Sequence, residues 1–181
     1  GSQLAALFSA AKPGEQVIDL CAGAGGKTLA LAAMMEGKGR LIATDHDKRQ
    51  LAPIYERLSR AGVHNADIRA PKGDADPLAD IRASADLVLI DAPCTGTGTW
   101  RRNPDAKWRM RPGALEVRLK DQVTVLDCAA ALAKPGGRIA YITCSVLPQE
   151  NGEQIKAFLA RHPEFAVVPP DPTFQNQHIF V

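Results

Sequence analysis

The fold of this chain is decided by residues 87–98, which read LVLIDAPCTGTG. The first four residues are apolar and branched, as in the buried strands of a parallel sheet. The strand then ends in an acid, a proline and a thiol (Asp91, Pro93, Cys94), followed by glycines at Gly96 and Gly98. Open α/β sheets bind ligands beyond the carboxyl ends of their strands. We therefore expect this turn to carry function as well as structure.

The composition fits one soluble-type domain over residues 1–181, because 45% of the residues are hydrophobic and the net charge is only +2. No run of about 18 apolar residues predicts a membrane span, and no signal-peptide pattern opens the chain. The four cysteines form no C-x-x-C pair, which argues against a structural zinc site. We expect a cytoplasmic monomer with reduced thiols, no bound metal and no membrane contact.

Strand-like and helix-like segments alternate along the chain. Strands are predicted at 16–20, 40–44, 66–70, 85–90 and 138–143, with a further one at 165–168. Helices are predicted at 4–11, 28–35, 48–61, 115–133 and 150–161, and a long irregular loop at 92–113. This alternation predicts an α/β fold with a doubly wound, mostly parallel sheet.

The turn after the first strand, residues 19–28, reads DLCAGAGGKT and is rich in glycine. A dinucleotide fingerprint would place its third glycine at position 28, which is Thr28. A phosphate-binding P-loop needs four residues between its first glycine and its Gly-Lys-Thr, whereas only two separate Gly23 from Gly26. Both patterns fail on spacing, and an NAD-dependent oxidoreductase is disfavoured with them.

Three motifs together resemble those of the RNA cytosine-5 methyltransferases, in particular the bacterial 16S ribosomal RNA branch known as the Sun or Fmu group. They are the D-x-C-A-x-x-G-G-K-T turn, residues 91–98 (DAPCTGTG) and residues 143–145 (TCS). Gly23 and Ala24 depart from the family pattern, which has alanine and proline there. The resemblance implies a Rossmann-like methyltransferase fold, S-adenosylmethionine as cofactor and RNA as substrate. Ribosomal RNA is the expected substrate class, with transfer RNA as the alternative.

The resemblance also assigns the cofactor contacts. Asp45 would accept hydrogen bonds from the ribose hydroxyls, Asp74 from the adenine amino group, and Asp91 would lie near the methionine end. Acids after strands are often only helix caps, but three at successive strand ends favour a ligand. The turn that would wrap the cofactor consists of Cys21, Ala22, Gly23, Ala24, Gly25, Gly26 and Lys27.

Two thiols suit the chemistry of cytosine methylation. Cytosine C5 is a poor nucleophile until a thiolate adds to C6, and the thiol must later be eliminated. Cys94 and Cys144 both follow strands, and their spacing does not say which one attacks; DNA cytosine methyltransferases use a Pro-Cys thiol. The resemblance implies that Cys144 is the nucleophile and that Cys94 assists product release. It also places Asp91 on the base and Lys27 in the catalytic set.

The remaining two cysteines are expected to have structural roles and no part in the reaction. Cys128 lies among alanines in a predicted helix, where a packing role is expected, and Cys21 would contribute backbone near the cofactor.

The loop at residues 100–111, WRRNPDAKWRMR, holds five basic residues, one acid and both tryptophans. Basic groups neutralise phosphates and aromatic rings stack on unpaired bases. A solvated loop whose tryptophans anchor it to the core is the alternative interpretation. A base inside a helix would have to be turned out before attack at C6. The predicted RNA contacts are Arg101, Arg102, Lys107, Trp108 and Arg109.

A non-catalytic RNA-binding module that keeps the fold is the main rival, and the retained thiols speak against it. Family members usually carry an amino-terminal RNA-binding or NusB-like region and end in a hairpin with a G-x-D-G-F-F-like strand. Neither is found in residues 1–181. We therefore expect a fragment that binds cofactor but methylates RNA poorly when isolated.

Overall fold

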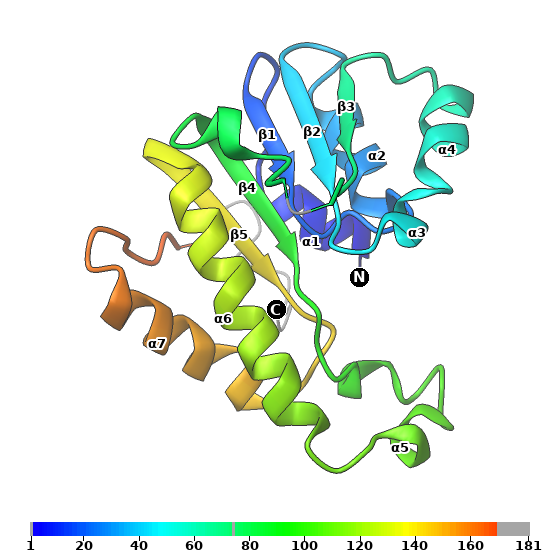
Figure 1. Ribbon diagram of the computed structural model, residues 1–181, viewed down its shortest axis with the longest axis vertical. Coiled ribbons are helices and arrows are strands. Elements are labelled where there is room, and N and C mark those ends of the chain that lie inside the picture. Colours follow the sequence, from blue (N-terminus) through cyan, green and yellow to red (C-terminus); the bar gives the residue numbers. More distant parts are fainter. Residues whose placement is uncertain (1, 74, 170–181) are drawn as a thin grey trace. The chain divides into compact units, whose positions relative to one another are not determined.

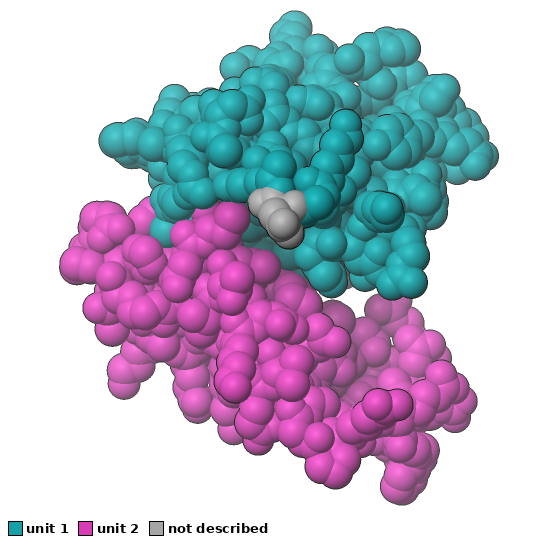
Figure 2. All heavy atoms as spheres, in the orientation of Figure 1, with its two compact units in different colours: residues 1–91, 129–141 teal, residues 92–128, 142–181 magenta. Residues whose placement is uncertain are grey.

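The computed structural model describes residues 2–73 and 75–169. These divide into two compact units (Figure 2). Unit 1 comprises residues 1–91 and 129–141, and unit 2 comprises residues 92–128 and 142–181. Asp74 and the expected carboxyl-terminal hairpin lie outside the described residues.

A five-stranded sheet with the order β3-β2-β1-β4-β5 forms the framework of unit 1 (Figure 1). Its arrows run in one direction, and the β1–β2, β1–β4 and β2–β3 pairings are parallel. The sheet is parallel and doubly wound, as the sequence predicts, and its Rossmann-like fold is the one that the resemblance implies. The strands are β1 (Gln16–Asp19), β2 (Arg40–Thr44), β3 (Ala66–Arg69), β4 (Ala85–Asp91) and β5 (Ala133–Ile142).

Helices and short 3-10 turns connect the strands. In unit 1, α1 packs against α2, and α2 packs against β1 and β2. In unit 2, α6 and α7 are joined by a hydrogen bond of 2.8 Å from Gln154 Nε2 to the carbonyl of Leu119. The α-helices are α1 (Ser2–Phe8), α2 (Gly26–Met34), α3 (Lys48–Leu51), α4 (Ile54–Arg60), α5 (Ala106–Arg109), α6 (Ala114–Leu132) and α7 (Gly152–Arg161). The 3-10 turns are η1 (Ala79–Ile81), η2 (Thr97–Thr99) and η3 (Pro148–Glu150).

The central strands are apolar because both of their faces are buried. Ile18, Ile42 and Leu89 are each 0% exposed, which matches the continuous hydrophobic runs typical of parallel sheets. The strand register pairs Asp19 with Ala43 on one side and with Leu89 on the other. The strands therefore end together, with Asp19 and Asp91 as the last residues of β1 and β4 and Asp45 directly after β2.

Most predicted elements are confirmed within two residues, but three predictions are wrong. The helix predicted at 48–61 is broken into α3 and α4 at Pro53, because proline has no N–H to donate to the preceding turn. The last strand begins at Ala133 instead of residue 138. Its first part runs close to β4, where a Cβ on Gly137 would lie 2.6 Å from the carbonyl oxygen of Ala85.

No strand forms at residues 165–168. Phe165 instead packs its ring against Phe158 at a centroid distance of 5.4 Å. Val167 and Val168 are 69% and 78% exposed, so their side chains pack against little of the part of the chain that the structure describes. The loop predicted at 92–113 contains η2 and α5 and is otherwise irregular.

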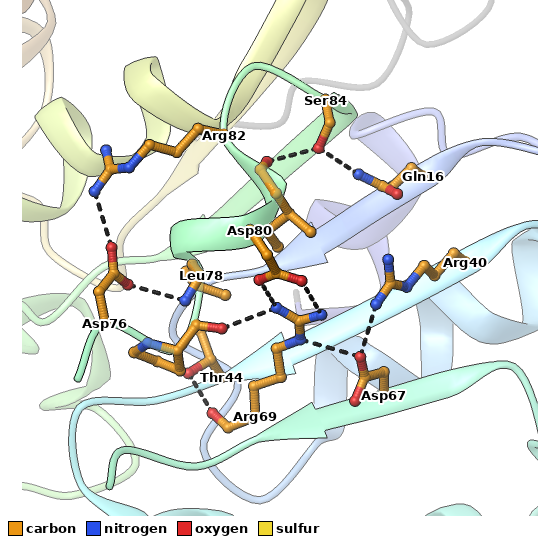
Figure 3. A network of polar contacts seen from close by, with 12 residues as sticks. Gln16, Arg40, Thr44, Asp67, Arg69, Asp76, Leu78, Asp80, Arg82 and Ser84 are labelled. Carbon is orange, nitrogen blue, oxygen red and sulfur yellow. Dashed lines mark hydrogen bonds and ion pairs between the residues drawn. The ribbon is translucent and has the colours of Figure 1, made fainter. Parts of the chain in front are cut away.

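Arg69, at the end of β3, fixes the segment that follows it (Figure 3). Its guanidinium donates to both carboxylate oxygens of Asp80, to the carbonyl oxygen of Pro77 at 2.9 Å and to Asp67 at 3.0 Å. Asp67 also accepts a hydrogen bond from Arg40 at 3.0 Å. This forked geometry is specific to arginine. The chain between β3 and η1 is thereby tied to the sheet.

Within residues 2–73 and 75–169, no helix has the length and apolar character needed to span a bilayer.

Candidate active site

The glycine-rich turn between β1 and α2 has the backbone conformation that glycine allows. Gly23 and Gly25 have φ angles of +50° and +82°, in the left-handed region that other residues seldom enter. A Cβ on Gly25 would lie 2.5 Å from Cγ1 of Ile54, so a larger residue is excluded by space as well. The amide of Gly25 donates to the carbonyl of Ala22 at 2.9 Å. The turn is a compact loop that leads into the amino terminus of α2.

Asp19, the first residue of this motif, is completely buried. Its Oδ2 accepts a hydrogen bond of 2.7 Å from the hydroxyl of Thr28, whereas its Oδ1 has no partner among the described residues. Burial, together with the negative charges of Asp91 and Asp45, raises the pKa of Asp19 to about 7, although Thr28 and Lys27 act in the opposite direction. The sequence analysis quoted this residue but gave it no role. Strand position alone does not reveal how deeply an acid is buried.

Lys27 and Asp91 form an ion pair, with Nζ 2.5 Å from Oδ2. The Lys27 side chain is only 10% exposed, while that of Asp91 is 42% exposed. A buried ammonium needs a charged partner, and Asp91 at the end of β4 provides it. The two residues that the sequence analysis assigned to different motifs are thus in direct contact.

Asp45 follows β2 and is 5% exposed. One carboxylate oxygen accepts a hydrogen bond from the amide of Gly23 at 3.0 Å, and the other accepts from the amide of Asp47 at 3.1 Å. His46 Nδ1 lies 3.0 Å from the second oxygen. Because a carboxylate has about four acceptor positions and three groups already contact it, about one position remains for a further donor such as a hydroxyl. Asp45 therefore joins the glycine-rich turn to β2, whereas Asp74 lies outside the described residues.

The two candidate catalytic thiols lie side by side in unit 2. Cys94 Sγ and Cys144 Sγ are 3.2 Å apart, with one thiol donating to the other. The hydrogen bond from Cys144 lowers the pKa of Cys94 to about 7, against the effects of burial and of Glu150. Cys144 is exposed and Cys94 is half-buried. A thiolate is therefore available in this pair near neutral pH.

The turns that carry these thiols are joined by hydrogen bonds. The amide of Gly98 donates to the carbonyl of Cys144 at 2.9 Å. Thr97 Oγ1 lies 3.0 Å from Ser145 Oγ and also accepts from the amide of Val146 at 3.0 Å. These contacts span about fifty positions in the sequence and bring the second and third motifs into one site.

A buried carboxylate lies beneath this pair of turns, and sequence reasoning missed it. Glu150 is 0% exposed and accepts hydrogen bonds from Thr95 and from Gln122, which is also 0% exposed. The only sequence signal was a polar residue, Gln122, on the otherwise apolar face of a predicted helix that carries Leu119 and Leu126. Such a residue needs a buried partner.

The other two cysteines, Cys21 and Cys128, are partly buried. Cys128 lies in α6, where the sequence analysis placed it.

The basic loop is exposed. Trp108 is 81% exposed, and Lys107 Nζ lies 4.7 Å from the centroid of its ring. The idea that Trp108 anchors the loop to the core is therefore wrong, because a ring this exposed has little to pack against. Trp100 is partly buried. The basic side chains of the same loop are also exposed, namely Arg101, Arg102, Lys107 and Arg109.

Across residues 2–73 and 75–169, no group of three or more histidine, cysteine, aspartate or glutamate side chains is arranged to hold a metal ion.

Comparisons with known proteins identify the family of this chain. The chain is 38% identical over 179 residues to ribosomal RNA small subunit methyltransferase B of Salmonella newport (strain SL254), an alignment that covers 97% of the chain and 41% of that protein. The chain therefore spans less than half the length of this relative.

Solved structures are also similar to this chain. The crystal structure of PH0851 superposes with a TM-score of 0.89 at 38% identity, covering 98% of this chain and 40% of that one. The structure of NSun6 from Pyrococcus horikoshii with SFG has a TM-score of 0.77 at 30% identity, covering 88% of this chain and 40% of that one. The family described as 16S rRNA methyltransferase RsmB/F matches residues 6–179. On this evidence, the chain belongs to the 16S rRNA methyltransferase RsmB/F family.

Proposed function

We propose that this chain is the catalytic part of an S-adenosylmethionine-dependent enzyme that methylates cytosine C5 in ribosomal RNA through a covalent cysteine adduct. The observation that carries the proposal is the Cys94–Cys144 pair, with an Sγ–Sγ distance of 3.2 Å. One thiol alone has many uses in proteins, whereas two adjacent thiols after neighbouring strands suit a reaction that needs both addition and elimination.

The residues of unit 1 fit the proposed cofactor. The glycine-rich turn offers amides at the amino terminus of α2, and such termini bind polar groups without a side chain. Asp45 retains acceptor capacity for a ribose hydroxyl, and Lys27 holds Asp91 in place at the carboxyl end of β4. When bound, S-adenosylmethionine supplies an electrophilic methyl group. The name of the relative from Salmonella newport, ribosomal RNA small subunit methyltransferase B, supports the same assignment.

In the proposed reaction, the Cys144 thiolate forms an Sγ–C6 bond with the cytosine, and the electron pair displaced from the C5–C6 double bond makes C5 nucleophilic. Asp91 contacts the base at N3 or at the amino group and favours this addition. After C5 has been methylated, it loses its proton to the Cys94 thiolate, whose pKa is about 7, and the C5–C6 double bond reforms as the Sγ–C6 bond breaks. Cys94 then passes this proton to the departing Cys144 sulfur, 3.2 Å away, and completes the release.

The basic side chains around Trp108 are the proposed RNA contacts. They would bind phosphates, and the exposed indole offers a flat face to an unpaired base.

The test is methyl transfer to ribosomal RNA by the intact protein, read as 5-methylcytosine by mass spectrometry. Cys144→Ala is expected to abolish both methylation and the covalent RNA adduct. Cys94→Ala is expected to form the adduct and then stall. Cys128→Ala is the matched thiol control and should change neither.

Several outcomes would change the assignment. Normal methylation by Cys144→Ala would remove Cys144 as the nucleophile. An adduct lost in Cys94→Ala but kept in Cys144→Ala would exchange the two roles. Methylation of transfer RNA and not of ribosomal RNA would change the proposed substrate to transfer RNA.

A further inference from the structure

Glu150 is a completely buried acid that the proposed reaction does not use. It is the last residue of η3 and is 0% exposed. Burying a carboxylate is costly unless several donors satisfy it. Glu150 lies next to the turns that carry the two thiols, so the burial of its carboxylate needs a physical explanation.

Glu150 is linked to the residues on both sides of Cys94 in the sequence. On one side of the thiol, Glu150 accepts hydrogen bonds from the amide of Thr95, at 2.8 Å, and from the hydroxyl of Thr95. On the other side, Gln122 Nε2 donates to Glu150 at 2.9 Å and to the carbonyl of Pro93 at 2.9 Å. Both residues that flank Cys94 are therefore anchored to one carboxylate, directly or through Gln122.

The same carboxylate also reaches the turn that carries the other thiol. Burial opposes its ionisation, but hydrogen bonds from Ser145, Thr95 and Gln122 hold the pKa of Glu150 below its usual range. Ser145 is the neighbour of Cys144, and its hydroxyl lies 3.5 Å from that of Thr95. An ionised Glu150 thus joins the neighbours of both thiols.

We propose that Glu150 is a positioning residue that holds Cys94 at hydrogen-bonding distance from Cys144, so that Cys94 can act when the Cys144–RNA bond breaks. Since it has no exposed surface, Glu150 does not touch the substrate and acts only through the Cys94 turn. This inference rests on the proposed function, because it needs the adduct that Cys144 would form. The part that concerns the thiol geometry can be measured without RNA.

The charge of Glu150 has a second, separable effect. The groups that bear on the ionisation of Cys94 are Cys144, the backbone of Cys144 and Gly96, and Glu150, whose negative charge opposes a thiolate. A glutamine at position 150 keeps the shape and one carbonyl oxygen for the donors but loses this charge. An alanine loses both. Comparing the two variants therefore distinguishes anchoring from electrostatics.

The first experiment follows turnover and adduct accumulation in the intact protein with ribosomal RNA. In Glu150→Ala, turnover should fall on the order of 10- to 100-fold, as expected for a misplaced reacting group, while the Cys144–RNA adduct accumulates. Glu150→Gln should recover part of the turnover. Glu153→Gln is the matched control, because Glu153 is exposed in the first turn of α7, three positions further on, and should match the wild type.

The second experiment measures the rate of Cys94 alkylation by iodoacetamide against pH, with peptide mass spectrometry identifying the thiol. Glu150→Gln should move the midpoint of Cys94 to lower pH, whereas Glu153→Gln should leave it in place. A residue with a merely structural role would not move this midpoint in a folded variant.

The proposal is overturned if folded Glu150→Ala turns over like the wild type, or if turnover and adduct formation fall together with no accumulation. If Glu150→Ala does not fold, turnover by Glu150→Gln at the wild-type rate overturns it instead. A wild type that forms neither adduct nor product would refute the proposed function, and the alkylation experiment would still decide whether Glu150 controls Cys94.

Discussion

Replacing Asp19 by asparagine is expected to remove a large pH dependence from the stability of the protein. Asp19 is buried at the end of β1 with one oxygen unpartnered among the described residues, and its pKa is raised from 3.8 to about 7. Asparagine has nearly the shape of the protonated acid and cannot ionise. The substitution therefore isolates the cost of the charge from the packing of the side chain.

The magnitude follows from the pKa difference between the folded and unfolded states. Each pKa unit corresponds to about 1.4 kcal/mol, so a rise from 3.8 to about 7 corresponds to about 4 kcal/mol. Between these two values the folded state binds more protons than the unfolded state. The free energy of unfolding must therefore fall as the pH rises through this window. Below it both states are protonated, and above it the destabilisation is complete and constant.

The assay is urea denaturation of the wild type and of Asp19→Asn at several pH values from about 4 to about 8. The two proteins should have nearly equal free energies of unfolding at the acid end, and the variant should be more stable by up to about 4 kcal/mol at the alkaline end. A difference that stays constant across this range would refute the reasoning, because it would show that Asp19 has the same pKa in both states.

Asp67 provides a control of opposite sign. Although burial opposes it, the hydrogen bonds from Arg69 and Arg40 lower the pKa of Asp67. Its contribution to stability is present at neutral pH and is lost as the pH falls through the folded pKa. Asp67→Asn should therefore be destabilised at neutral pH, and the difference from the wild type should shrink towards acid pH.

Three further substitutions test other parts of the structure. Gly98→Ala would place a Cβ 2.8 Å from the carbonyl oxygen of Cys144 and should lower the free energy of unfolding by about 1–3 kcal/mol; Gly152→Ala, where the space is open, should be neutral or slightly stabilising in the same urea titration. Trp108→Ala should weaken RNA binding by about 1–3 kcal/mol, the usual contribution of a stacked base, without moving the urea midpoint; an unchanged dissociation constant would remove this ring from the RNA interface. Arg69→Met should release the segment between β3 and η1, seen as faster proteolysis between residues 70 and 82, and equal cleavage rates would show that the guanidinium does not hold it.

The sheet could be predicted from the sequence because its cause is local. Continuous apolar runs such as Leu87–Ile90, bounded by glycine, proline and acids, predict buried parallel strands, and parallel strands bring their carboxyl ends together. The acids Asp45 and Asp91 were found in this way, as were both thiols. Pro53 by itself predicts a break in the helix, but the helical periodicity on both sides of it predicts a single helix at 48–61.

The polar interior could not be predicted, because it depends on contacts between distant segments. Glu150 and Gln122 are ordinary polar residues in the sequence, and only the packing of η3 and α6 against the Cys94 turn makes them a buried pair. Asp19 is another case, since its depth of burial depends on the strands on both sides. The strand predicted at residues 165–168 is a similar case, because β-branched residues adopt a strand according to the segments they can pair with and pack against, which their own sequence does not reveal.

The division into two units has a practical consequence for anyone who dissects this protein. Each unit is built from two separate stretches of the chain, and the backbone passes from one unit to the other after residues 91, 128 and 141. Neither unit can be expressed as one uninterrupted segment. Ending the chain after residue 91 or 128 leaves both units incomplete, and ending it after residue 141 leaves unit 2 incomplete. Two of the crossings lie within three residues of Cys94 and Cys144. A circular permutant or an inserted tag at either place would therefore alter the thiol pair itself, whereas an insertion at residue 128 would interrupt α6.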